Sequence, residues 1–361
     1  EPYFAPDVSN AEVAAAVGED IAVIAQKHDR ALATDVMSRG AEKLVPQLFA
    51  EGKFDGIISV GGSGGTSLAT PAMRALPIGV PKVMVSTMAS GNVSQYVGTS
   101  DVVMFPSVVD AEGLNEISMR IFSNAVNAVA GMVENRIDIP DSGKPLLAAT
   151  MFGVTTPCIK TAKEYLESQG YEVLVFHATG AGGKSMEALI NAGFIKGVLD
   201  ITTTEWCDEL YGGVLNAGPD RLEAAGKKGI PQVVSVGALD MVNFGPWDTV
   251  PEQYKGRNLY PHNPTVTLMR TTIEENRGLG KVIAEKLSMA KGPTALMLPL
   301  GGVSAIDAPG QPFYGPEEDA ALFEELRRGI GPNVELVEMQ NNVNDDDFAL
   351  AAAKKLIELM K

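Results

Sequence analysis

Cysteine and histidine are scarce in this chain of 361 residues, which has two cysteines and three histidines. Cys158 and Cys207 lie far apart and show neither a C-x-x-C pair nor the cysteine and histidine spacing of a zinc site. A chain of this length can bury a core that needs no disulfide scaffold. We therefore expect no structural zinc centre, and we expect a reducing, cytoplasmic location.

Basic residues and long apolar runs are also lacking. The chain has 29 lysines and arginines against 45 aspartates and glutamates, a net charge of −16, and no stretch rich in Lys or Arg. This balance disfavours binding to nucleic acid or to anionic membranes. No segment reaches the roughly 18 uninterrupted apolar residues of a membrane span, and no signal-peptide pattern opens the sequence. We expect neither nucleic acid nor a membrane as a partner.

Glycine, by contrast, is abundant, and two segments share the spacing G-x-G-G-x-S: residues 62–67 and residues 180–185. Each follows an apolar run that predicts a strand and precedes a segment that predicts a helix. Glycines let backbone N–H groups approach a ligand, and the N-terminus of a helix adds partial positive charge. We predict that both loops bind phosphates or carboxylates; the alternative is that they only form tight turns.

Neither loop completes a known nucleotide-binding fingerprint. A P-loop requires glycine where Ala178 stands, and a dinucleotide-binding loop requires glycine where Ser67 and Ser185 stand. Lys184 would neutralise part of the charge of the anion. The residues predicted to hold the nucleotide are Gly62, Ser63, Gly64, Gly65 and Thr66 in the first loop and Gly180, Gly182, Gly183, Lys184 and Ser185 in the second.

The hydrophobic pattern predicts an α/β protein of two domains. Apolar strands alternate with helices, as in doubly wound parallel sheets, and the polar, breaker-rich residues 135–145 indicate a boundary. We predict two Rossmann-like domains, residues 1–140 and 141–361, with a cleft between them. Residues 241–267 show no regular pattern and are expected to form a lid or an oligomer contact. The first residue is Glu1 rather than Met, so we expect the natural N-terminus to lie upstream.

Polar residues gather where the predicted strands of the second half end, and parallel α/β sheets bind ligands at those ends. Asp200 and Glu205 flank three threonines, and this carboxylate pair is suited to hold magnesium beside a phosphate. The alternative is that the threonines end a strand and Glu205 begins a helix. The hydroxyls of Thr155, Thr202 and Thr203 are expected to donate hydrogen bonds to the ligand.

Two of the histidines are candidates for catalysis together with Glu205. His177 ends a predicted strand beside the second glycine loop, and His262 lies in the irregular stretch. Both are suited to act as general acid or base or to contact a phosphate. A structural hydrogen-bond donor is the alternative role for His177. A Ser-His-Asp arrangement could be assembled from Ser63, His177 and Asp200, but we disfavour serine hydrolysis.

Several runs of residues resemble an uncharacterised protein family that includes the N-terminal domain of a tomato mosaic virus resistance protein. They are GGSGGT (61–66), VSTMASG (85–91), HATGAGGK (177–184), DITTTE (200–205), GALDMVNF (237–244), RTT (270–272) and PLGGVS (299–304). The resemblance extends over nearly the whole chain and implies two Rossmann-like subdomains, an ATP-binding cleft and dimerisation. Members of the family begin with a strand and a G-T-x-D-T-K-like turn, which do not precede Glu1 here. We therefore expect the first domain to lack one strand.

The residues and the resemblance lead to one expected function and two alternatives. We expect a cytoplasmic, homodimeric, ATP-binding protein that is an enzyme or enzyme subunit, acts on a small phosphorylated or carboxylated metabolite and uses Mg²⁺. The first alternative is a nonenzymatic ATP-binding regulatory or interaction module. The second is a nucleotide-independent lyase or hydrolase of a small carboxylate.

Overall fold

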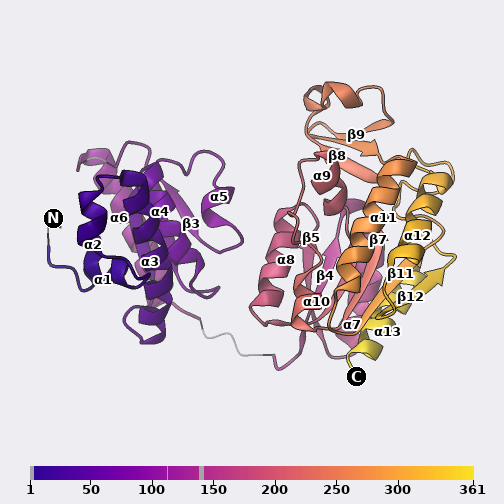
Figure 1. Ribbon diagram of the computed structural model, residues 1–361, viewed down its shortest axis with the longest axis horizontal. Coiled ribbons are helices and arrows are strands. Elements are labelled where there is room, and N and C mark those ends of the chain that lie inside the picture. The colour runs from indigo at the N-terminus through magenta and orange to yellow at the C-terminus, as the bar shows by residue number, and fades with distance from the viewer. Residues whose placement is uncertain (1–3, 112, 138–141) are drawn as a thin grey trace. The chain divides into compact units, whose positions relative to one another are not determined.

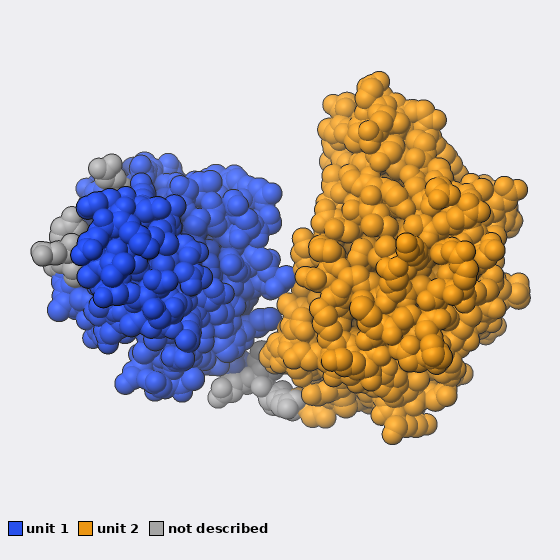
Figure 2. Space-filling model, in the orientation of Figure 1, with its two compact units in different colours: residues 1–140 blue, residues 141–361 orange. Residues whose placement is uncertain are grey.

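The computed structural model describes residues 4–111, 113–137 and 142–361. The chain divides into two compact units, Glu1–Pro140 and Asp141–Lys361, which Figure 2 draws in blue and orange. Part of the predicted boundary segment, residues 138–141, lies outside the described residues. Each unit contains a parallel sheet flanked by helices, so the predicted Rossmann-like α/β fold class is confirmed.

Unit 1 is built on a three-stranded parallel sheet in the order β1-β2-β3 (Figure 1). The strands are β1 (Ile57–Gly61), β2 (Lys82–Ser86) and β3 (Val103–Pro106). Helix α4 (Ser63–Arg74) packs on β1 and β2, and α3 (Arg30–Ala50) packs on α4. Apolar side chains of α6 (Glu116–Glu134) cover Val83 and Val85 of β2. The shorter helices are α1 (Asn10–Ala15), α2 (Ile21–Gln26) and α5 (Ser94–Val97).

Unit 2 contains a six-stranded parallel sheet in the order β12-β11-β7-β6-β4-β5. Its strands are β4 (Leu146–Met151), β5 (Glu172–His177), β6 (Ile195–Thr202), β7 (Gln232–Gly237), β11 (Thr294–Pro299) and β12 (Val334–Met339). Neighbouring residues of one strand face opposite helix layers. Val233 packs with residues of α7 and α13, whereas Val234 packs with residues of α11 and α12. Burial on both faces explains why the inner strands β7 and β11 are mostly apolar.

The helices of unit 2 cover both faces of this sheet (Figure 1). They are α7 (Thr156–Ser168), α8 (Ala181–Asn191), α9 (Glu205–Tyr211), α10 (Ala224–Lys228), α11 (Ile273–Ser288), α12 (Pro316–Gly329) and α13 (Asp346–Leu359), with single 3-10 turns at η1 (Gly153–Thr155), η2 (Trp247–Thr249) and η3 (Glu252–Tyr254). No helix in the described part of the chain is both long and apolar enough to cross a membrane. The strand order reverses between β4 and β6, and ligands of open parallel sheets bind at such a switch point.

Residues 241–267 form most of a second, antiparallel sheet in the order β8-β10-β9. Its strands are β8 (Met241–Phe244), β9 (Leu259–Asn263) and β10 (Val266–Arg270). The prediction of an irregular stretch is therefore wrong. The strands are short, and Pro261 and Pro264 interrupt the apolar pattern that would have revealed them. Pro261 lies in β9, an edge strand, where a sheet tolerates proline.

Candidate anion-binding site

Both G-x-G-G-x-S loops connect the carboxyl end of a parallel strand to a helix, as the sequence predicts. Gly62 is the N-cap of α4 directly after β1, and Gly180 is the N-cap of α8 shortly after β5. The backbone is tightly folded in the first loop, because a Cβ atom on Gly61 would lie 2.9 Å from the Cα atom of Gly65. The two loops therefore share the order strand, glycine turn and helix, but their backbones differ, because Gly62 is extended with a φ of −77° whereas Gly180 has a φ of +82°.

The second loop holds a carboxylate that belongs to the chain itself. The backbone N–H groups of Gly180 and Gly183 donate to Oε1 of Glu205 at 2.7 and 3.0 Å. A Cβ atom on Gly183 would lie 2.2 Å from Oε2 of Glu205, so only glycine leaves room for this carboxylate. Glu205 is the first residue of α9 and is almost fully buried. The loop thus holds an anion, but this anion is a side chain 22 residues away from Gly183, and binding of a ligand's phosphate or carboxylate by the loop stays a prediction.

Arg221 holds the same carboxylate from its other side. Its Nε atom donates to Oε2 of Glu205 at 2.7 Å, and its Nη2 atom donates to Oδ1 of Asp200 at 2.8 Å. Asp200 also accepts the hydroxyl of Thr150 at 2.7 Å. Burial acts to lower the pKa of Arg221, but the carboxylates of Asp200, Glu205 and Glu187 raise it, so the guanidinium stays charged.

Asp200 and Glu205 therefore lie together, as predicted, and both face a guanidinium. Their role as magnesium ligands stays a prediction, which would require Mg²⁺ to replace Arg221. Across residues 4–111, 113–137 and 142–361, no group of three or more His, Cys, Asp or Glu side chains is arranged to hold a metal ion.

The three predicted threonines lie at the switch point of the sheet, but inside the protein. The hydroxyls of Thr155 and Thr202 share a hydrogen bond of 2.8 Å, and the hydroxyl of Thr203 donates to the carbonyl of Ser235 at 3.0 Å. All three are fully buried. Their hydroxyls stabilise the ends of β4, β6 and β7, and a role toward a ligand stays a prediction.

The remaining predicted residues of unit 2 lie at or near the surface. Lys184 is exposed in the first turn of α8, and Ser185 is half-buried beside it. A Cβ atom on Gly182 would lie 1.8 Å from the carbonyl oxygen of His177, so this glycine allows close backbone packing. The exposed ring of His177 lies 5.4 Å from that of Phe152, whereas His262 is exposed on β9. No contact among the described residues joins the two histidines.

The first loop also connects a strand to a helix, but no carboxylate among the described residues fills it. Gly62 provides no side-chain cap for α4, and the first turn of this helix has no acidic residue. Ser63, Gly64 and Gly65 are exposed, and in the described part of the chain their backbone N–H groups meet no acceptor. The hydroxyl of Thr66 points inward, donating to the carbonyl of Gly62 at 2.7 Å and lying 2.6 Å from the hydroxyl of Ser86. The first loop is thus an open counterpart of the second.

A cation and a polar cavity adjoin this open loop. A Cβ atom on Gly64 would lie 3.7 Å from Nη2 of Arg30, a guanidinium for which the described residues provide no ion pair. On the other side, a Cβ atom on Gly62 would lie 3.7 Å from the hydroxyl of Thr87. Thr87 is part of the wall of a cavity of about 350 Å³ at the carboxyl ends of β2 and β3. This cavity is lined by Thr87, Ser90, Ser107, Val108, Val109 and Asp110.

Arg30 and Arg221 are the charged side chains beside the two loops that the sequence did not predict. Arg30 begins α3 and reaches the first loop only because α3 packs on α4. Arg221 lies in a segment without regular structure between α9 and α10. Neither position belongs to a motif, so no local signal connects these cations to the loops that they adjoin.

Comparison with known proteins finds matches along nearly the whole chain. Two family models match: the N-terminal domain of the Uncharacterised protein family (UPF0261) over residues 1–138 and its C-terminal domain over residues 144–360. The chain belongs to the UPF0261 family. A UPF0261 protein of Clostridium tetani is 59% identical, with 100% of this chain and 90% of the relative covered. The ToMV resistance protein Tm-1 of Solanum lycopersicum is 48% identical, with 91% of this chain but only 45% of the plant protein covered.

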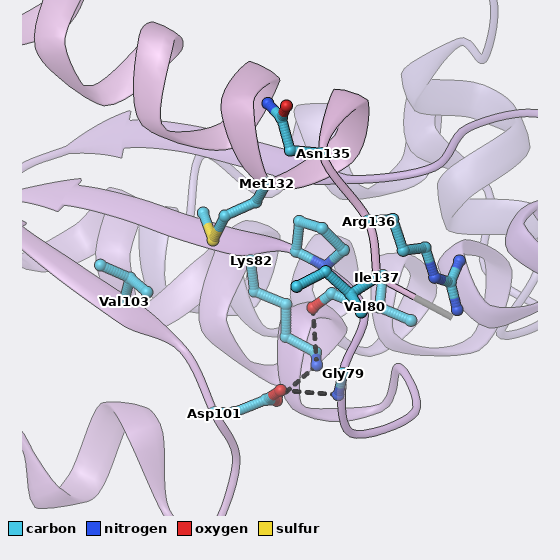
Figure 3. Close-up of a pocket in the computed structure, with 10 residues that line it drawn as sticks. Gly79, Val80, Lys82, Asp101, Val103, Met132, Asn135, Arg136 and Ile137 are labelled. Carbon is cyan, nitrogen blue, oxygen red and sulfur yellow. Dashed lines mark hydrogen bonds and ion pairs between the residues drawn. The ribbon is translucent and has the colours of Figure 1, made fainter. Parts of the chain in front are cut away.

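The UPF0261 chain also has a cavity of about 650 Å³ at the opposite, amino-terminal edge of the unit 1 sheet (Figure 3). Fully buried Lys82 lies in its wall, and its ammonium donates to the carbonyls of Pro77 and Val80 and to Oδ1 of Asp101. Lys82 therefore has no free charge to offer a ligand. The cavity also lies away from the carboxyl ends, where open parallel sheets bind ligands.

A second buried charge cluster of this UPF0261 chain surrounds Arg270, at the end of β10. Its Nη2 atom donates to Oδ1 of Asp319 at 2.8 Å and lies 3.7 Å from Oδ1 of Asp307. Ser304 donates to Oδ2 of Asp240 at 2.7 Å. Burial and the nearby charge of Asp307 raise the pKa of Asp240 to about 7 and that of Asp319 to about 8, against the opposing effect of Arg270. Because this cluster is buried, we assign it to stability rather than to ligand binding.

Proposed function

We propose that this UPF0261 protein binds a nucleotide, ATP, and that the phosphates of the nucleotide lie on the open loop of unit 1, residues 62–67. The observation that carries the proposal is the contrast between the two loops. The second loop uses two backbone N–H groups to hold a carboxylate, so the spacing supports anion binding within this very chain. In the first loop the corresponding N–H groups are those of half-buried Gly62 and exposed Gly65, and the described residues provide no acceptor for either.

The surroundings of the first loop favour a phosphate chain over a single carboxylate. Three exposed N–H groups stand at the N-terminus of the 12-residue helix α4, where the helix dipole favours negative charge. Arg30 adds a full positive charge, and its planar guanidinium is suited to contact phosphate oxygens in pairs. The protein as a whole carries a net charge of −16, so local donors of this kind are needed to bind a polyanion.

The test is calorimetric titration of the protein with ATP, comparing the wild type with Arg30→Ala. Loss of a charge-assisted contact is expected to raise the Kd by about 10- to 100-fold, equivalent to roughly 1.5–3 kcal/mol. Arg39→Ala is the matched control, because Arg39 is an exposed arginine of the same helix and pairs with Asp35 on the surface. It should leave the Kd within about twofold, as expected for a surface pair.

Lys184→Ala distinguishes the two loops in the same titration. Lys184 stands in the first turn of α8, in the loop that Glu205 fills. A loss of affinity with Lys184→Ala but not with Arg30→Ala would transfer the ligand to the second loop and contradict the proposal. Absence of binding at millimolar ATP would remove nucleotide binding altogether.

We also propose that Mg²⁺ accompanies the nucleotide as a counter-ion of the phosphates rather than as a resident metal. Asp200 and Glu205 are both engaged by Arg221, so binding of Mg²⁺ there would separate a buried ion pair. Titration of ATP in EDTA and in excess Mg²⁺ tests this step. Binding that needs Mg²⁺ and is abolished by Asp200→Asn in a folded protein would restore the pair as metal ligands.

A further inference from the structure

The cavity at the carboxyl ends of β2 and β3 is a candidate binding site in its own right. It has a volume of about 350 Å³, and its lining is almost entirely polar, with hydroxyls from Thr87, Ser90 and Ser107 and a carboxylate from Asp110. None of the described residues that line it is a lysine, an arginine or a histidine. Pockets for apolar or aromatic ligands are lined mainly by apolar side chains. This cavity therefore suits neither an apolar nor an anionic ligand.

The side chains of this lining have hydrogen-bonding capacity that the protein does not use. The hydroxyls of Thr87 and Ser90 have no hydrogen-bond partner in the described part of the chain. Asp110 receives one donor from the described residues, a backbone N–H that lies 2.7 Å from Oδ1, so its Oδ2 atom is available. The hydroxyl of Ser107 donates to a backbone carbonyl at 2.7 Å and can still accept. The cavity therefore offers two free donors and several free acceptors.

The turn that connects Ser107 to Asp110 has a strained backbone. Val108, in this turn, has a φ of +63°, which a β-branched residue rarely adopts. The N–H of Val109 donates to the carbonyl of Ser107 at 2.7 Å, as in a γ-turn, and positive φ at the central residue is the strained form of that turn. The side chain of Val108 is 76% exposed, so its packing does not compensate for the strain. Strained backbone of this kind concentrates at ligand-binding sites.

We infer that this cavity binds a small, uncharged polyhydroxylated molecule, a single sugar ring or a polyol of similar size, through the hydroxyls of Thr87 and Ser90 and the carboxylate of Asp110. Each hydroxyl of such a ligand both donates and accepts, which matches two hydroxyls that are free to do both and a carboxylate that only accepts. The volume lies at the lower end of the range of ligand pockets, about 300–1,000 Å³. A bound Ca²⁺ would need about six to eight oxygen ligands, whereas Asp110 is the only carboxylate among the described residues of the lining.

The experiment titrates the full chain with D-ribose, D-glucose and myo-inositol as probes, in EDTA and without nucleotide, by saturation-transfer difference NMR. At least one probe is expected to bind, whereas cyclohexanol, which has the ring of inositol but a single hydroxyl, is expected not to bind. Ser90→Ala should raise the Kd of the bound probe about three- to tenfold, the loss of one neutral hydrogen bond. Asp110→Ala should raise it about tenfold or more, because a bond to a charged group is stronger. Ser123→Ala and Asp55→Ala, at exposed positions outside the cavity, are the matched controls and should leave the Kd within about twofold.

This inference goes beyond the proposed function and does not depend on it, because none of the described residues that line the cavity belongs to the open loop, residues 62–67. Arg30→Ala, which should weaken the binding of ATP, should leave the Kd of the probe within about twofold. Failure of all three probes to bind at millimolar concentration would overturn the inference and leave nucleotide binding untouched. Equal losses in Ser90→Ala and Ser123→Ala at an unchanged melting temperature, or a loss in Arg30→Ala, would move the probe to another site and overturn the inference as well.

Discussion

Asp319 keeps its proton at a pH where an ordinary aspartate has lost it, because burial and the carboxylate of Asp307 raise its pKa to about 8. An aspartate of the unfolded chain releases its proton near pH 4. Between about pH 4 and 8 the folded state therefore binds more protons, and its stability falls as the pH rises, by up to about 1.4 kcal/mol per pH unit for one proton. Asp319→Asn should flatten this fall, measured by urea unfolding at several pH values.

Asparagine is a close mimic of the protonated Asp319, since its oxygen can accept from Arg270 and its amide can donate to Asp307. Glu317→Gln, an exposed position in the same turn of α12, should leave the pH dependence of the wild type intact. A fall in stability that is equally steep in Asp319→Asn and in the wild type would show that Asp319 does not hold the proton.

At the scale of single residues, the sequence predicts the two glycine loops of the site but not the charged side chains that lie against them. The glycine spacing predicts the two loops correctly, because close backbone approach and a helix start are local requirements. Glu205 fills the second loop from 25 residues beyond Gly180, and Arg30 reaches the first loop from another helix. Such contacts arise from tertiary packing, which no local spacing encodes.

At the scale of elements, one side chain ties the antiparallel sheet to α11. Arg257, which precedes β9, donates from both terminal nitrogens to the carboxylate of Glu275 at 3.0 and 2.7 Å and also to the carbonyl of Arg270. Glu275 lies in the first turn of α11, where it forms a capping box with Thr272. Arg257→Ala should cost about 1.5–3 kcal/mol, as for paired charge-assisted bonds. Amides of β9 should exchange faster in hydrogen–deuterium exchange, whereas those of β7 should not.

Arg277→Ala is the matched control for this clamp. Arg277 pairs with Glu274 on the surface of α11, with the two side chains 52% and 85% exposed. Its loss is expected to change stability by less than about 0.5 kcal/mol and to leave the exchange of β9 unchanged. Unaltered exchange of β9 in Arg257→Ala would mean that the ladder with β10 alone holds this strand.

The elements themselves were predictable wherever the apolar pattern was continuous. The inner strands β7 and β11 of the unit 2 sheet are buried on both faces, so each is a mostly apolar run bounded by glycine or proline. The short strands β8 and β9 lack that signal, because β8 has only four residues, β9 is largely exposed, and they contain polar residues such as Asn243 and His262. Their pairing depends on tertiary context.

At the scale of the whole molecule, the two units have cores of unequal size. In unit 1 the described apolar clusters are small, and Ile58 and Val60 of β1 remain 37% and 43% exposed. Unit 2 has extensive clusters on both faces of its sheet. We therefore expect two unfolding transitions in calorimetry, with unit 1 melting first. Since the proposed site lies in unit 1, ATP at about 100 times its Kd should raise only the lower transition, by about 5 °C or more.

A fragment that spans residues 142–361 provides the control. Its single transition should coincide with the upper transition of the full chain and should not respond to ATP. If ATP instead raises the melting temperature of this fragment, the nucleotide binds unit 2 and the open loop is not its site.

Glu205 has a consequence for how many ligands one chain can take up. The spacing G-x-G-G-x-S occurs twice in the sequence, but in the second loop the carboxylate of Glu205 already accepts hydrogen bonds from the backbone N–H groups of Gly180 and Gly183. Under the proposed function, saturation is therefore reached at one anion per chain rather than two. The number of glycine motifs in the sequence therefore exceeds the number of anions that one chain can bind, because a side chain of the protein already occupies one of the two motifs.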